Sequence, residues 1–450
     1  MEDNWKNFFK GKKVTMMGLG LLGRGIGVAK FMAKYGAELI ITDLKPREKL
    51  ESSVEQLEEY ELQITYVFGE HRKEDFENRD MVIKSAGVPL VNEFIDHARK
   101  HGVPVEMDAS LFARLVPEGV ILVGITGTRG KSTVTHLIYH ILKTAGKRVF
   151  LGGNVRGLAT LPLLEEVRDG DYVVLELDSW QLQGFGEAKI SPQIAVFTNL
   201  MPDHMNYYKN DMERYFEDKA NIFLYQGKED TLVAGSEILD KIKSKYGDKL
   251  KGRVVEVVDG LPSEWELSLA GVHNRYNAAL AVGAGRALGI SEDLLVKAVG
   301  TFKPVEGRLE YMGEINGVRI YNDNNATTPE ATVAGLEAVA KGKNVILIMG
   351  GADKGLDMSG LVVAIKKYCW GVLLLSGTGT ERVKGDIKST GDLVTRENEK
   401  LEELVTEAFK LAKSGDVILF SPALASFSQY FQNEYERNDL FVGCVRKKLV

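Results

Sequence analysis

The sequence predicts an α/β protein built from three successive domains. Apolar, strand-like runs alternate with helical patterns along the whole chain, which is typical of mostly parallel sheets covered by helices. Several runs end in glycine-rich or polar turns, where open α/β sheets bind ligands. At 450 residues the chain is too long for one ordinary core. We expect an N-terminal Rossmann-like domain at residues 1–110, a central P-loop domain at 111–303 and a C-terminal Rossmann-like domain at 304–450.

Composition narrows the class of protein. The chain is 44% hydrophobic and 27% charged, with a formal net charge of −6, which argues against a nucleic-acid-binding surface. Its two cysteines cannot form a disulfide framework. No apolar run is long enough to span a bilayer, and the first residues lack a signal-peptide core. We therefore expect a cytoplasmic monomer that acts on small molecules.

The N-terminal domain opens with a phosphate-binding fingerprint. A strand at 13–17 leads into a G-x-G-x-x-G turn and a helix at 26–35, and a second strand at 38–41 is followed by Asp43. The turn consists of Gly18, Leu19, Gly20, Leu21, Leu22 and Gly23. It suits NAD or FAD, another diphosphate, or a purely structural turn. Strands at 80–83, which runs into the turn with Gly87, and at 103–107 complete this domain.

The central domain begins with a P-loop. A strand at 120–125 precedes the loop and a helix at 134–145 follows it. Glycines let the backbone wrap an anion, and the helix start adds free N–H groups. The loop residues are Gly127, Thr128, Gly130, Lys131, Ser132 and Thr133. Lys131 would reach the β- and γ-phosphates and Ser132 or Thr133 would hold Mg²⁺. The strict Walker spacing requires a glycine where Ile125 stands, so an incidental glycine-rich turn is the alternative.

Further polar residues follow the central strands. A strand at 148–151 leads to Asn154, and the apolar strand at 172–177 carries Glu176, which is either a Mg²⁺ ligand or a residue of an edge strand. A strand at 193–197 leads to His204. Lys219 lies in a predicted helix at 212–225, where by itself it is a surface lysine.

The C-terminal domain repeats the alternation. A helix at 277–287 and a link at 302–306 precede it. Strands at 318–321, 344–349, 371–375 and 416–420 each end in a polar or glycine-rich turn. A site built between domains is expected.

These landmarks, in this order, resemble the Mur ligases, the ATP-dependent amide-bond-forming enzymes of peptidoglycan synthesis, over nearly the whole chain. The pieces that carry the resemblance are T-G-T-R-G-K-S-T at 126–133, G-L-G-L-L-G at 18–23, G-G-N at 152–154, L-E-L-D-S-W-Q-L at 175–182, D-H-M at 203–205, H-N-R-Y-N at 273–277, G-R-L-E at 307–310, Y-N-D at 321–323, G-G-A-D-K at 350–354 and S-P-A-L-A-S-F at 421–427. The resemblance implies transfer of D-glutamate to UDP-N-acetylmuramoyl-L-alanine through an acyl phosphate, with release of ADP and phosphate.

The resemblance also implies residue roles. The residues expected to bind the UDP substrate are Gly18, Gly20, Leu21, Leu22, Gly23, Asp43, Lys45, Gly87, Asn154 and Ser179. The residues expected to bind ATP are the P-loop residues with Asn274, Asn277, Arg308 and Asp323. The residues expected to bind the amino acid are Thr327, Lys354, Ser426 and Phe427. Two Mg²⁺ ions would use Ser132, Thr133, Glu176, His204 and a carbamylated Lys219, and Lys131, Glu176, His204 and Lys219 would be catalytic.

Three departures keep the amino acid open. Asn325 replaces the family's lysine, so one cation is expected to be missing, and Asp178 adds a negative charge. The segment 432–438 is rewritten relative to the family pattern. The alternatives are a Mur-type ligase for another amino acid, a folylpolyglutamate-type ligase, a non-catalytic ATP-binding regulator and an NAD-dependent oxidoreductase.

Overall fold

The computed structural model describes residues 4–20, 23–389, 391, 393–426, 430–431 and 433–449. Leu21, Leu22 and Phe427, three of the predicted site residues, lie outside these ranges. The chain divides into two compact units, the first made of residues 1–259 and 277–298 and the second of 260–276 and 299–450. Each unit is described by itself. The predicted domain boundaries at 110 and 303 stay a prediction.

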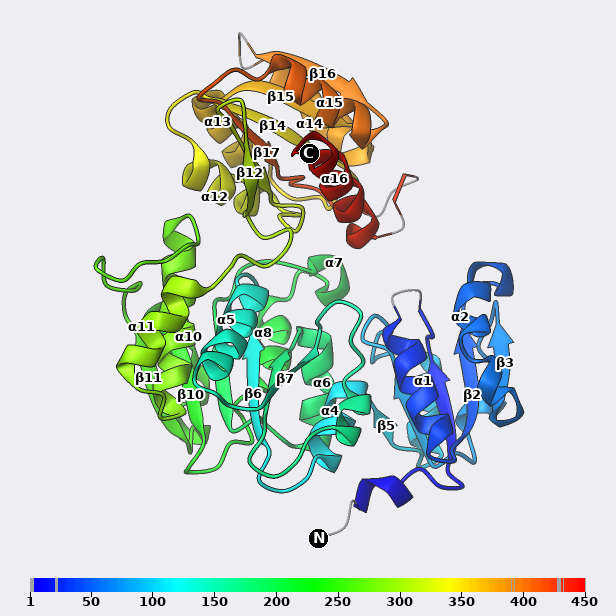
Figure 1. The fold of residues 1–450 in the computed structure, drawn as a ribbon. Helices are drawn as coiled ribbons and strands as arrows, with labels where there is room; N and C mark the ends of the chain where they lie inside the picture. The colour runs from blue at the N-terminus through cyan, green and yellow to red at the C-terminus, as the bar shows by residue number, and fades with distance from the viewer. Residues whose placement is uncertain are drawn as a thin grey trace. The chain divides into compact units, whose positions relative to one another are not determined.

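Unit 1 contains two parallel sheets (Figure 1). The first has the strand order β3-β2-β1-β4-β5. Its elements are β1 Lys13–Met17, α1 Arg24–Lys34, β2 Glu38–Asp43, α2 Glu51–Glu55, β3 Ile64–Phe68, β4 Met81–Lys84, α3 Glu93–Lys100, β5 Val105–Glu106 and α4 Asp108–Leu115. The order reverses between β1 and β4, which puts the glycine loop after β1 beside the turn after β4. This is the topological switch point at which such sheets bind ligands.

The second sheet of unit 1 has the order β11-β10-β9-β6-β8-β7. Its strands are β6 Ile121–Thr126, β7 Val149–Gly153, β8 Tyr172–Glu176, β9 Ile194–Phe197, β10 Thr231–Gly235 and β11 Arg253–Val257. Its helices are α5 Lys131–Thr144, α6 Ser179–Ala188, α7 Met205–Tyr208, α8 Met212–Ala220 and α9 Ser236–Tyr246. Most of α10 Val272–Ala287 and of α11 Glu292–Thr301 also belongs to unit 1, which includes residues 277–298. The P-loop strand β6 lies between β8 and β9, so both neighbours end beside the loop.

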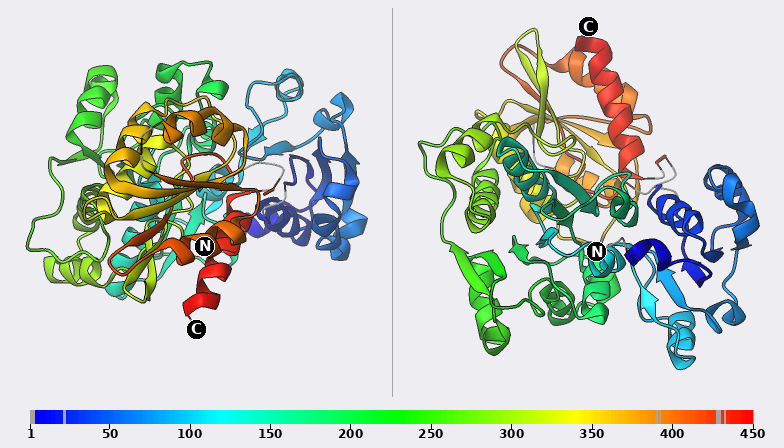
Figure 2. Two further views of the ribbon diagram at one scale, coloured as in Figure 1. Left: turned by 90° about the horizontal axis from the view of Figure 1, so that it is seen from above. Right: turned by 60° about the horizontal axis from the view of Figure 1, so that its bottom comes forward.

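Unit 2 contains the third sheet, of order β12-β13-β17-β14-β15-β16, which Figure 2 shows from two further sides. Its elements are β12 Glu310–Ile315, β13 Val318–Asn322, α12 Pro329–Val339, β14 Val345–Gly350, α13 Ser359–Tyr368, β15 Cys369–Leu375, α14 Thr378–Lys388, β16 Val394–Asn398, α15 Leu401–Leu411, β17 Val417–Phe420 and α16 Glu434–Leu449. Only β12 pairs antiparallel, with β13, among the strand pairs described here.

The α/β class with three mostly parallel sheets is confirmed. The sequence pattern missed five strands, β3, β10, β11, β12 and β16. In β11 and β12 most residues are exposed or half-buried, so they lack the continuous apolar run of a buried strand. The helix expected over 212–225 is also shorter, because Asn221 caps α8 and donates its side-chain amide to the Asp218 carbonyl at 3.1 Å.

Candidate functional site

The loop between β6 and α5 can only be built with glycine at two positions. Gly127 has φ 138°, and a Cβ there would lie 1.9 Å from the Thr198 hydroxyl oxygen. Gly130 has φ 81° and caps α5, and a Cβ there would lie 2.3 Å from Asn277 Oδ1. The backbone therefore turns tightly around the N-terminus of α5, where free N–H groups and the helix dipole favour an anion.

Two lysines converge on this loop. Lys131 Nζ donates to the carbonyls of Gly127 at 3.0 Å and Thr128 at 3.1 Å. Lys219 Nζ, from α8, donates to the same Gly127 carbonyl at 2.9 Å. Lys219 is 1% exposed, and burial, with a further contribution from the Lys131 charge, holds the pKa of its amine well below the usual value. A buried amine, whose charged form burial disfavours, thus lies directly against the P-loop.

The carboxyl ends of β8 and β9 bring other predicted residues to the same sheet edge. Glu176, the last residue of β8, is buried and pairs with Ile125 of β6. The segment after β9 follows the P-loop: the Asn199 carbonyl accepts from Thr128 N at 2.9 Å, and its side chain accepts from Arg129 N at 2.8 Å. Arg129 also pairs with Asp203 at 2.8 Å.

The remaining central-domain residues lie on short segments around this edge. His204 follows Asp203, and its half-exposed ring lies 4.7 Å from the Trp180 ring. Ser132 and Thr133 form the first turn of α5. Asn277, from α10, packs on Gly130. Lys131, Lys219, Glu176 and Asn277 are therefore gathered at one end of this sheet, with the 199–204 segment along the loop.

The glycine loop after β1 is held by a carboxylate. Asp43, at the end of β2, accepts from Leu19 N at 3.1 Å and Gly20 N at 3.2 Å through Oδ2, and from Lys45 N at 2.9 Å through Oδ1. Its side chain is buried. Asp43 thus shapes the loop, a role that the fingerprint alone did not reveal.

The neighbouring turn after β4 closes on this loop. Gly18 has φ 92°, its carbonyl accepts a hydrogen bond from the Ser85 hydroxyl, and a Cβ at Gly18 would contact Ser85 and Val88. Gly87 lies exposed in the same turn. Gly23 caps α1 with φ 80°. The loop and turn expected to hold the UDP diphosphate are therefore adjacent.

A buried lysine in this turn was not predicted as a site residue. Lys84 ends β4, is 1% exposed and donates to the Val88 carbonyl at 3.0 Å. Burial lowers its pKa to about 8. The signal in the sequence was a charged residue at the end of an otherwise apolar strand. Lys84 is thus a further lysine near the glycine loop, in addition to Lys45.

Asn154 and Ser179 belong to the part of unit 1 that contains its second sheet. Asn154 follows β7, donates its N–H to the Glu176 carbonyl at 2.6 Å and accepts from Arg24 of α1 at 3.0 Å. Ser179 is buried at the start of α6. Both therefore lie near the end of β8 that carries Glu176.

Asp178, the additional negative charge relative to the family pattern, caps α6. Its carboxylate accepts from Gln181 N at 2.7 Å, and the Gln181 side chain accepts from Asp178 N at 3.2 Å. This reciprocal pair is a capping box. The departure from the family pattern therefore has a local structural role in starting the helix.

In unit 2, the turn after β13 contains a buried carboxylate. Asp323 accepts from Leu309 N and from the Ser421 hydroxyl, both at 3.0 Å, and burial raises its pKa to about 7. Arg308 is close enough to act on this pKa. Asn274 lies in the unit 2 part of α10, and its side chain donates to Ala270 O at 2.7 Å.

The residues expected to bind the amino acid also lie in unit 2. Lys354 Nζ donates to the Thr327 hydroxyl at 3.1 Å, so these two predicted residues are in direct contact. Ser426 is buried after β17. Lys354, the lysine expected to bind the amino acid, is thus hydrogen-bonded to a hydroxyl of the same predicted site.

A buried arginine contacts the turn with Asn325, where one cation was expected to be missing. Arg437 of α16 is fully buried and donates from Nε to Asn324 Oδ1 at 2.8 Å and from Nη2 to the Asn324 carbonyl at 2.9 Å. Burial lowers its pKa to about 10. Sequence reasoning missed Arg437 because it lies 113 positions from its partner. An arginine from another element therefore holds this turn.

Three family models match the chain, described as the Mur ligase MurD-like N-terminal domain over residues 12–106, the Mur ligase middle domain over 125–258 and the Mur ligase glutamate ligase domain over 307–424. Together with full-length relatives, they show that the chain belongs to the Mur ligase family. UDP-N-acetylmuramoylalanine--D-glutamate ligase of Roseiflexus sp. (strain RS-1) is 33% identical over 96% of this chain and 97% of that protein.

Other relatives agree with this family. The protein of the same name from Geobacillus kaustophilus is 34% identical and is covered over 98% of both chains. Among solved structures, UDP-N-acetylmuramate-alanine ligase MurC of Thermotoga maritima matches with a TM-score of 0.62 at 21% identity, over 97% of this chain and 100% of that one. MurF ligase of Thermotoga maritima, in complex with ADP, matches with a TM-score of 0.57 at 18% identity, over 84% of this chain and 97% of that one. These structures share the fold.

Proposed function

We propose that this chain is an ATP-dependent amide ligase of peptidoglycan precursor synthesis that adds D-glutamate to UDP-N-acetylmuramoyl-L-alanine. Lys219 carries the proposal, because a buried amine with a lowered pKa against a P-loop carbonyl has a specific use in this reaction. The names of the full-length relatives support the choice of substrates.

The reaction proceeds in two transfers. The muramoyl-alanine carboxylate attacks the γ-phosphorus of ATP, which gives an acyl phosphate and ADP. The D-glutamate amine then attacks the acyl carbon, and the tetrahedral intermediate expels phosphate as the amine loses its proton. Lys131 Nζ is hydrogen-bonded to two loop carbonyls in this structure. With ATP bound, it would instead contact the phosphate oxygens and neutralise the negative charge that develops on them during transfer.

The central residues also suit Mg²⁺. The Ser132 or Thr133 hydroxyl and the buried Glu176 carboxylate are hard oxygen donors, and such a carboxylate needs a cation when buried. Bound Mg²⁺ would neutralise phosphate charge and polarise the transferring group. His204 and Lys219 would hold the second ion, although an amine is a poor ligand for it.

Carbamylation removes this mismatch. The neutral form of the Lys219 amine attacks CO₂ and forms an N–C bond while one C=O π bond gives its electron pair to oxygen. Loss of a proton from nitrogen then leaves a carbamate, which is an oxygen ligand. Burial favours this step because it disfavours the ammonium form. Carbon-13 NMR of the protein in ¹³CO₂-equilibrated buffer should show a carbamate carbon that Lys219→Arg lacks.

The other predicted residues complete the proposal. The glycine loop with Asp43 and Lys45, the Gly87 turn, Asn154 and Ser179 would hold the UDP substrate. Asn274, Asn277, Arg308 and Asp323 would contact ATP, and Thr327, Lys354, Ser426 and Phe427 the amino acid. A monomer in the cytoplasm, where ATP is supplied, completes the prediction. In the described residues no helix has the length and apolarity needed to cross a membrane.

The test is phosphate release from Mg-ATP with UDP-N-acetylmuramoyl-L-alanine and a panel of D- and L-amino acids, with product mass followed in parallel. Release with D-glutamate alone supports the full proposal. Release with another amino acid keeps the ligase mechanism and overturns the assigned specificity. No release with any amino acid, while ATP still binds, overturns the proposed reaction and favours a regulator.

A further inference from the structure

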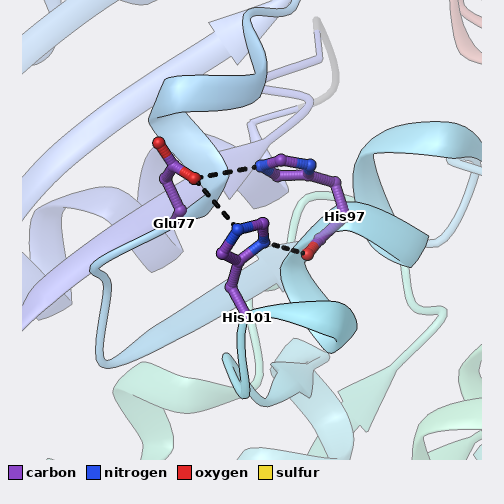
Figure 3. A group of neighbouring side chains, drawn as sticks. All are labelled: Glu77, His97 and His101. Carbon is purple, nitrogen blue, oxygen red and sulfur yellow. Dashed lines mark hydrogen bonds and ion pairs between the residues drawn. The ribbon is translucent and has the colours of Figure 1, made fainter.

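The N-terminal domain carries a cluster of two histidines and a glutamate that the ligase reaction does not use (Figure 3). Glu77 directly follows the short helix η4 Lys73–Phe76, His97 lies on α3, and His101 caps the end of α3. Within the described ranges, it is the one group of at least three His, Cys, Asp or Glu residues whose ligand atoms all lie within 4.8 Å of one another. We propose that this cluster binds a divalent transition-metal ion, Zn²⁺ in particular.

The distances suit such an ion. Glu77 Oε2 lies 3.3 Å from His97 Nε2 and 3.2 Å from His101 Nε2. Zn–N and Zn–O bonds of about 2.0–2.2 Å at tetrahedral angles place two ligand atoms about 3.3–3.5 Å apart. Histidines four residues apart share one face of a helix, a spacing that recurs in zinc sites. Two of the three ligand-atom pairs thus have the spacing of ligands on one ion, and all three atoms lie within 4.8 Å of one another, with water as a fourth ligand.

The orientation of His101 favours a metal over a simple hydrogen bond. His101 Nδ1 lies 2.9 Å from the His97 carbonyl oxygen, so it carries a proton and donates to that oxygen. In the neutral ring, Nε2 then directs a lone pair at the Glu77 carboxylate, and two acceptors at 3.2 Å repel. A backbone carbonyl that fixes the far nitrogen in this way is typical of metal-binding histidines.

An ion pair of Glu77 with one or both rings is the competing explanation, and the ring packing disfavours two charged rings. The His97 and His101 ring centroids are 4.2 Å apart with an interplanar angle of 40°. Two imidazolium cations at this separation would repel, and one carboxylate would have to neutralise both. A single divalent ion between neutral rings and the carboxylate satisfies all three groups without that repulsion.

The cluster is open to solvent and lies on a packed core. The side chains of His97, Glu77 and His101 are 21%, 32% and 44% exposed, so an ion can enter from solution. Beneath them, Phe76 and Ile95 belong to a buried apolar cluster. A bound ion would join the segment after η4 to the end of α3, and binding only to the folded state would stabilise it by mass action.

The test uses the full-length, untagged protein with excess Mg²⁺ present, so that oxygen-rich sites are filled. After dialysis against Zn²⁺ and then zinc-free buffer, we expect close to one zinc per chain and a higher unfolding temperature than for the metal-free protein. Titration with Co²⁺ should produce the visible absorption bands of a four-coordinate site. Loss of all zinc on dialysis, with no change in the unfolding temperature, overturns the proposal.

Matched variants locate the ion. Glu77→Gln, His97→Gln and His101→Gln should each weaken zinc binding at least about tenfold. His140→Gln is the control, because His136 and His140 on α5 have the same four-residue spacing but belong to no such cluster in the described chain. Near-UV circular dichroism checks that each variant is folded.

Two outcomes contradict the site. The first is equal zinc retention by Glu77→Gln and the unchanged protein. The second is stabilisation that appears on acidification without metal and is lost in Glu77→Gln, which would assign the cluster to proton-dependent ion pairs. Amide ligase activity is measured separately, so a failed metal test leaves the ligase proposal standing.

Discussion

The two glycine loops of unit 1 differ in the charges that hold them. The loop after β1 gives two backbone N–H groups, those of Leu19 and Gly20, to the Asp43 carboxylate. The loop after β6 instead offers the Gly127 carbonyl to two lysines. The first loop is shaped by an internal anion, and the second accepts hydrogen bonds from two lysine amines, one of them buried. Under the proposed function, the first loop would hold the UDP diphosphate, and the lysines at the second would neutralise a phosphoryl group that is transferred.

The largest expected effect is at the P-loop lysine. Lys131→Ala removes the charge that would neutralise the transferring group, so ATP-dependent phosphate release should fall roughly a thousandfold or more. Lys143→Ala, at the exposed end of the same helix, is the control and should keep normal rates. Normal turnover in Lys131→Ala would remove the distinction between the two loops.

Lys219→Ala should come next. Loss of the buried amine also removes the carbamate, so turnover should fall to roughly a hundredth or less. Short-chain carboxylates in the assay should restore part of the rate, because they can supply the missing oxygen ligand. Full activity without any additive would contradict the carbamate role.

Asp43→Asn tests the loop after β1. The change replaces charge-assisted hydrogen bonds with neutral ones, so the KM for the UDP substrate should rise roughly tenfold with kcat little changed. Asp80→Asn, at the opposite end of this sheet, is the control. A fall in kcat at constant KM would show that Asp43 acts on the transfer step instead.

The smallest expected effect is a difference in folding free energy between alanine variants of the two glycines that cap α1 and α5. Gly23 and Gly130 have nearly the same φ, 80° and 81°. Alanine at either costs roughly 1–2 kcal/mol of folding free energy in this conformation. Among the described residues, a Cβ at Gly23 would have no neighbour within 4 Å, whereas one at Gly130 would collide with Asn277. Urea unfolding should therefore show Gly130→Ala to be the less stable variant, and equal midpoints would contradict the packing described.

Sequence reasoning found those features that depend on neighbours in the chain. The P-loop, the β1 fingerprint and Glu176 at a strand end follow from local order and periodicity. The Asp178 and Gln181 positions of the capping box are also visible in the sequence, but Asp178 was expected only as an additional negative charge. The strands β11 and β12 were missed because exposed strands lack the apolar run on which that prediction depends.

Contacts between distant segments required the tertiary structure. Helical periodicity indicated a surface lysine at Lys219, which packing instead buries under the P-loop. Arg437 reaches the Asn324 turn across 113 positions, and Glu77 meets His97 across 20. The order of residues alone thus determined the fold class, the family and the two glycine loops, because short stretches of sequence define each of them. Burial, pKa and the partners of charged groups were decided only by folding, because they depend on which distant segments exclude water from them.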